Sequence, residues 1–93
     1  MRIAFDVDET LITTSAHGDT IPNFKVLQIL HNLYDLGCDI YVWSGGGIDY
    51  AELWARRLGL WGMVSIIPKD GNFNMDICFD DMEVNLAKVN IKV

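Results

Sequence analysis

The sequence predicts an α/β fold with a mostly parallel sheet of about five strands. Short apolar runs typical of buried strands alternate along the chain with segments whose apolar residues recur at helical spacing. Such alternation favours right-handed helical crossovers, which leave the strands parallel. The 93 residues have room for a single domain, 1–93, and 51% of them are hydrophobic, which suffices for a compact core.

The first part of the chain predicts a strand, a flap and a helix. Residues 2–7 read as a buried strand, and the Thr-, Ser- and Gly-containing residues 10–21 as a flap that can hold a small hairpin. Pro22 suits the first turn of a helix, where its missing N–H is not needed. Gly37 is placed to end this helix as a C-cap. The apolar residues at helical spacing are Val26, Ile29, Leu30, Leu33 and Leu36.

The second part predicts four more strands and one full helix. Asp49 is a plausible N-cap of that helix, Gly59 its stop, and Asp70-Gly71 a turn signal. In order, the elements are a strand at 39–43, a helix at 49–58, strands at 63–67 and 76–80, one or two helical turns at 81–87 and a short strand at 89–93.

Composition disfavours several classes of protein. No apolar run approaches the roughly 20 residues of a membrane span, and the N-terminus lacks a signal-peptide layout. We therefore expect a soluble, cytoplasmic protein with no membrane partner. The net charge of −6 disfavours non-specific nucleic-acid binding. Cys38 and Cys78 lack C-x-x-C spacing, so we expect buried thiols rather than a zinc site or a disulfide.

Residues with charged or hydroxyl side chains, which can bind ligands or react, follow four of the predicted strands at their carboxyl ends. In parallel sheets these ends lie at one edge, where ligands bind, so we expect the residues to converge on one rim. The four segments are Asp6-Val7-Asp8-Glu9-Thr10, Ser44-Gly45, Pro68-Lys69 and Asp80-Asp81.

This set of groups suits phosphoryl transfer. Carboxylates are the hard oxygen ligands that Mg²⁺ prefers, and Lys69 adds a positive charge. The Ser44 hydroxyl and the backbone N–H groups near Gly45, ahead of a helix N-terminus, can hold a phosphate. Together they make an electrostatic clamp, within which a carboxylate can be the nucleophile. The carboxylates expected to bind the metal are Asp6, Asp8, Asp80 and Asp81.

In these four motifs, in order and over nearly the whole chain, the sequence resembles a phosphatase of the haloacid dehalogenase (HAD) superfamily. That family carries D-x-D-x-T on the first strand, a Ser or Thr ending the second, then a Lys or Arg, and an acidic pair ending the fourth. The resemblance implies a three-layer α/β/α Rossmann-like fold. It also implies an Mg²⁺-dependent phosphomonoester hydrolase that works through an aspartyl-phosphate intermediate.

The resemblance also implies a role for each matched residue. Asp6 would be the nucleophile, and Asp8 would protonate the leaving oxygen, then activate water, while its carbonyl helps to bind Mg²⁺. Lys69 would neutralise charge between the phosphate and Asp6, and Thr10 would steady the motif loop. Ser44 and amides near Gly45 would hold the phosphoryl oxygens, and Asp80 and Asp81 would complete the metal site.

Family members often carry a cap domain, for which this chain has no room. Residues 6–44 hold one flap and one helix, and residues 44–69 one helix and one strand. We therefore expect an open site for a phosphorylated substrate, either a macromolecular phosphoester or a small molecule. A small substrate would be possible if the chain forms a homo-oligomer. Trp54 and Trp61 could contribute to the contact between its subunits.

Two other functions stay open at this point. A non-catalytic HAD-like binding module would fit the small size and the missing cap. The intact motif residues argue against it, because a module without catalysis would tolerate the loss of one of them. A receiver-like phospho-acceptor domain would place its acidic pair at the first strand and its acceptor at the third. Here D-x-D lies on the first strand and the acidic pair on the fourth.

Overall fold

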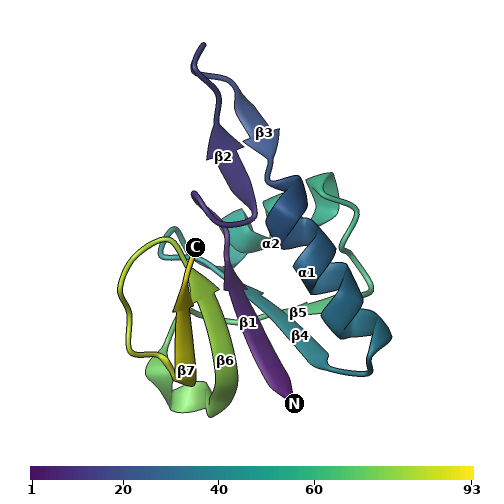
Figure 1. The fold of residues 1–93 in the computed structure, drawn as a ribbon, viewed down its shortest axis with the longest axis vertical. Helices are drawn as coiled ribbons and strands as arrows, with labels where there is room; N and C mark the ends of the chain where they lie inside the picture. Colours follow the sequence, from purple (N-terminus) through teal and green to yellow (C-terminus); the bar gives the residue numbers. More distant parts are fainter.

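Five parallel strands form the central sheet of the computed structural model, which describes residues 1–93 (Figure 1). The strand order is β5-β4-β1-β6-β7, and every neighbouring pair is parallel. The predicted α/β class and parallel sheet of about five strands are therefore confirmed. The strands are β1 (Arg2–Asp6), β4 (Asp39–Trp43), β5 (Val64–Ile66), β6 (Met75–Asp80) and β7 (Ala87–Lys92).

Both α-helices pack on one face of this sheet. Helix α1 (Phe24–Asp35) buries Leu27 and Leu30 there, and α2 (Ile48–Arg57) buries Ala51 and Ala55, small side chains that let it approach closely. The strands contribute alternate residues to the same core, as their pleat requires. Within this core the rings of Phe5 and Phe79 stack with their centroids 4.7 Å apart.

The opposite face of the sheet has no α-helix over it. A smaller core of Ala4, Trp43, Met75 and Cys78 is covered there by a 3-10 turn, η1 (Gly71–Phe73), and by the loop before β7. The helical turns predicted at 81–87 do not form, and β7 begins two residues earlier than the predicted strand at 89–93.

Asn90 gives the physical reason for this difference. Its Oδ1 accepts hydrogen bonds from the backbone N–H groups of Leu86 (2.9 Å) and Ala87 (3.0 Å) and from the Cys78 thiol (3.3 Å). Its Nδ2 donates to the Ala87 carbonyl at 2.9 Å. These bonds satisfy the local backbone groups in an extended turn, so that a helix is not needed to pair them.

Residues 12–22 form the small hairpin expected in the flap. Strands β2 (Ile12–Thr14) and β3 (Thr20–Pro22) pair antiparallel, and the hairpin projects beyond the carboxyl end of the sheet (Figure 1). The prediction that Pro22 lies in the first turn of the helix is wrong. Pro22 ends β3, where it pairs with Ile12, and α1 begins two residues later.

The predicted helix ends are close to the observed ones. Gly37, with φ +89°, follows the last turn of α1, as expected for a residue that ends a helix in the left-handed conformation. Helix α2 is capped by Gly47 rather than Asp49, and its φ of +103° explains why a glycine is needed there. Neither helix has the length and apolar character needed to cross a bilayer.

Candidate active site

Asp6 is the last residue of β1 and is only 5% exposed. Its Oδ1 accepts a hydrogen bond from Lys69 Nζ at 3.2 Å, and its Oδ2 accepts one from the fully buried Thr10 hydroxyl at 3.4 Å. Thr10 therefore steadies the carboxylate from within the same motif.

The chain leaves the sheet directly after Asp6, so Asp8 is not a strand residue. The backbone N–H groups of Thr10 and Leu11 both donate to the Val7 carbonyl, at 3.2 and 3.0 Å, and Glu9 has a left-handed φ of 58°. This tight turn exposes Asp8. It also directs Glu9 toward the hairpin, where its carboxylate accepts a hydrogen bond from Thr14 at 3.1 Å.

Lys69 lies between two buried carboxylates. Its Nζ is 3.2 Å from Asp6 Oδ1 and 2.7 Å from Asp80 Oδ2. Burial acts to lower the pKa of Lys69, but the contacts with Asp80 and Asp6 outweigh it and raise the pKa above its ordinary value. The ammonium therefore stays charged and joins the ends of β1 and β6.

Burial raises the pKa of Asp6 from 3.8 to about 6, and repulsion from Asp80 adds to this effect. Lys69 opposes both through its charge and its hydrogen bond. Asp6 is thus ionised at neutral pH yet poorly solvated, which suits a carboxylate that must attack another group.

Asp80 and Asp81 complete a cluster of three carboxylates with Asp6. One oxygen of each lies within 4.8 Å of the others. Asp80 is 1% exposed, and its Oδ1 accepts a hydrogen bond from the Met82 N–H at 2.9 Å. Its buried Oδ2 forms no hydrogen bond of good geometry and has only the Lys69 ammonium as a neighbour of opposite charge.

This donor set fits a hard divalent cation. Three carboxylates converge, and a buried oxygen keeps lone pairs available, as cations such as Mg²⁺ require. The side chain of Asp8, the fourth predicted ligand, is outside this cluster.

Ser44 and Gly45 follow β4, beside the end of β1. Trp43, the last residue of β4, is the register partner of Asp6, so Ser44 begins the loop next to it. The Ser44 hydroxyl is almost buried and accepts a hydrogen bond from the Gly46 N–H at 3.0 Å. Gly45 is exposed in the loop that leads to the N-terminus of α2.

Tyr50 joins the site, although the sequence analysis did not single it out. It lies in the first turn of α2, and its hydroxyl donates a hydrogen bond to Asp8 Oδ1 at 2.5 Å. This bond to a carboxylate is the main cause that raises the pKa of Tyr50. The sequence signal for Tyr50 was its position three residues after the Gly-rich loop, because this places it in the first turn of the helix, which faces the rim.

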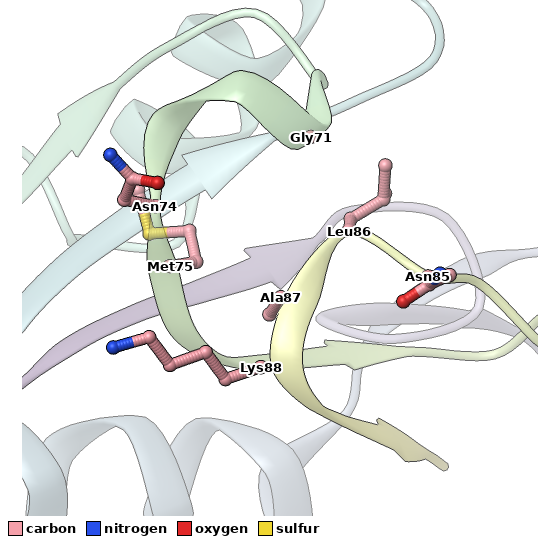
Figure 2. A pocket seen from close by; sticks show the side chains of 7 residues that line it. All are labelled: Gly71, Asn74, Met75, Asn85, Leu86, Ala87 and Lys88. Atoms are coloured by element: carbon pink, nitrogen blue, oxygen red, sulfur yellow. The ribbon is translucent and has the colours of Figure 1, made fainter.

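The hollow drawn in Figure 2 does not belong to this site. It has a volume of about 260 Å³ and is lined by Met75 and Ala87, the first residues of β6 and β7. Because parallel strands share their direction, this hollow lies at the opposite edge of the sheet from Asp6 and Asp80.

Comparison with known proteins identifies a viral relative of the chain. The chain is 33% identical over 70 residues to an uncharacterized 38.0 kDa protein, in the P143-LEF5 intergenic region, of Autographa californica nuclear polyhedrosis virus. The match covers 75% of this chain but 22% of the relative, so the chain spans about a fifth of that protein. No family model and no solved structure matches the chain.

Proposed function

We propose that this chain is a divalent-cation-dependent phosphomonoester hydrolase of the HAD type, with Asp6 as its nucleophile. The observation that carries the proposal is the array in which the Lys69 ammonium joins the buried carboxylates of Asp6 and Asp80 at the carboxyl edge of a parallel sheet. Asp81 and Ser44 lie at the same edge. A structural ion pair alone would not need a second buried carboxylate here, because removing charges from water is costly.

The proposed reaction has two steps. The Asp6 carboxylate attacks phosphorus, the bond between phosphorus and the leaving oxygen breaks, and Asp8 gives that oxygen its proton. Asp8 then takes a proton from water, whose oxygen attacks the aspartyl-phosphate and releases inorganic phosphate with free Asp6. The exposure of Asp8 suits this role, since it must meet both the leaving alcohol and water.

The remaining groups would bind and stabilise the phosphoryl group. Mg²⁺, held by Asp6, Asp80 and Asp81, would supply positive charge against the phosphate. Lys69 would keep the phosphate and the Asp6 carboxylate from repelling each other, and Ser44 with the Gly45 amide would hold phosphoryl oxygens.

A fold of the HAD type would have a second layer on the face of the sheet opposite α1 and α2. In a three-layer α/β/α arrangement, η1 and the loop before β7 would stand in for the second helical layer. Because the residues between the motifs form the β2–β3 hairpin and single helices rather than a cap domain, the site would be open and would admit a macromolecular phosphoester as well as a small molecule.

Turnover with and without the nucleophile tests the proposed function. Wild-type protein should hydrolyse 4-nitrophenyl phosphate with Mg²⁺ and lose activity when the metal is chelated. Asp6→Asn should lower kcat by at least about a thousandfold, because it removes the group that forms the intermediate. Asp39→Asn is the matched control, since Asp39 begins β4 at the opposite edge of the sheet.

The absence of Mg²⁺-dependent turnover across a panel of phosphoesters would contradict the proposal. Equal activity of wild type and Asp6→Asn would contradict the role of Asp6. Stable labelling by acetyl phosphate without hydrolysis would instead favour a receiver-like phospho-acceptor.

A further inference from the structure

Asp8 needs an external support to act as a directed proton donor. It lies beyond the end of β1 in an exposed turn, and it makes no ion pair. The hydroxyl of Tyr50, 42 residues later in the chain, is the side-chain partner that its carboxylate has. An exposed carboxylate without such a partner would sample several rotamers.

The Tyr50 ring is itself held against the loop that follows β4. A Cβ atom added at Gly46 would lie 3.2 Å from Tyr50 Cδ2 and 3.3 Å from both Tyr50 Cγ and Ser44 Oγ. A side chain at position 46 would require the Tyr50 ring or the Ser44 hydroxyl to move by a few tenths of an ångström, so the ring lies directly against this loop. Tyr50 therefore connects the loop proposed to hold the phosphate with the carboxylate proposed to move the proton.

We propose that Tyr50 is a positioning residue that fixes the orientation of Asp8 for proton transfer to the leaving oxygen. The hydroxyl occupies Oδ1 of Asp8 and so leaves Oδ2 free to carry the proton. This inference rests on the proposed hydrolase function, which it deepens by assigning a role to a residue outside the four motifs.

The direction of the hydrogen bond supports this role. The Tyr50 hydroxyl is the donor and the Asp8 carboxylate the acceptor, so the contact holds Asp8 through an oxygen that does not carry the transferred proton. Positioning contributes strongly to rate, because displacement of a reacting group by about 1 Å can cost about a hundredfold.

The test compares two substrates of similar size whose leaving groups differ in their need for a proton. Benzyl phosphate releases a strongly basic alkoxide, which needs the proton of Asp8, whereas 4-nitrophenyl phosphate releases a stabilised phenolate, which needs it little. Tyr50→Phe keeps the ring and removes the hydroxyl. Its kcat/KM should fall about ten- to a hundredfold for benzyl phosphate and less than about threefold for 4-nitrophenyl phosphate.

Tyr34→Phe is the control, because Tyr34 lies on α1 and is exposed. It should change neither value, and urea unfolding should show that both variants fold like the wild type. An equal loss on the two substrates, or no loss on benzyl phosphate, would overturn the role of Tyr50 while leaving the hydrolase function intact. Failure of the wild type to hydrolyse either ester would instead overturn the proposed function, and this inference with it.

Discussion

Replacing Asp6 by asparagine should stabilise the metal-free protein at neutral pH while it abolishes turnover. The pKa of Asp6 is about 6 in the folded protein and 3.8 as the ordinary value for an unfolded chain. Between these values the native state binds more protons than the unfolded state, so the free energy of unfolding falls as pH rises. The Asp6→Asn variant would have no such titration at this position, because an amide does not ionise.

The size of the effect follows from the same two values. The difference between 3.8 and about 6 corresponds to at most about 3 kcal/mol. The introduced amide loses the hydrogen bond from Lys69 and brings its own NH₂ group toward that ammonium, which reduces the expected gain to about 1–2 kcal/mol. Thr10 can still donate to the amide oxygen, and Lys69 keeps its shorter contact with Asp80.

Urea unfolding with a chelator present, followed by tryptophan fluorescence, measures this gain. Trp43 is fully buried and should report the transition. The two proteins should be about equally stable near pH 4, and Asp6→Asn should become the more stable one by pH 7.5, with the change between about 4 and 6. A difference that is the same at every pH, or a wild type that is more stable at pH 7.5, would refute the reasoning.

Two further substitutions test the supports of the site and of the second face of the sheet. Lys69→Met leaves the Asp6 and Asp80 carboxylates without their cation, so it should lower the free energy of unfolding by about 2–4 kcal/mol at neutral pH. Mg²⁺ should restore part of this stability. A loss below about 1 kcal/mol in urea unfolding would contradict this prediction. Asn90→Ala removes the acceptor for two backbone N–H groups at the start of β7, and should cost about 1–3 kcal/mol and speed amide exchange there. The exposed Asn85→Ala serves as its control, and an equal loss in both variants would count against the role of Asn90.

The parallel sheet and the convergence of the motifs could be predicted because both follow from chain-wide patterns. Apolar runs mark the strands, and the rule that parallel strands share one carboxyl edge then places Asp6, Ser44, Lys69 and Asp80 together. The structure bears out this placement for Asp6, Lys69 and Asp80 through direct contacts, and for Ser44 through strand register.

The details that escaped prediction depend on the hydrogen bonds of single side chains. Asn90 determines that the preceding loop is extended, through bonds that no local propensity encodes. The Asp8–Tyr50 contact depends on the left-handed turn at Glu9 and on the direction in which α2 starts. Neither the backbone conformation at Glu9 nor the direction of α2 can be predicted from a pattern of apolar residues.

The end of β7 has a practical consequence for any fusion protein. The N–H of Val93 donates to the Asp80 carbonyl at 2.8 Å, which places this end of the chain at the rim, whereas Met1 lies at the far edge of the sheet (Figure 1). An affinity tag joined after Val93 would emerge beside Asp80, and the imidazoles of a polyhistidine tag would bring transition-metal ions such as Ni²⁺ or Zn²⁺ next to the carboxylates. A tag attached before Met1 would leave the carboxylates free, and is the better choice for metal-binding and turnover measurements.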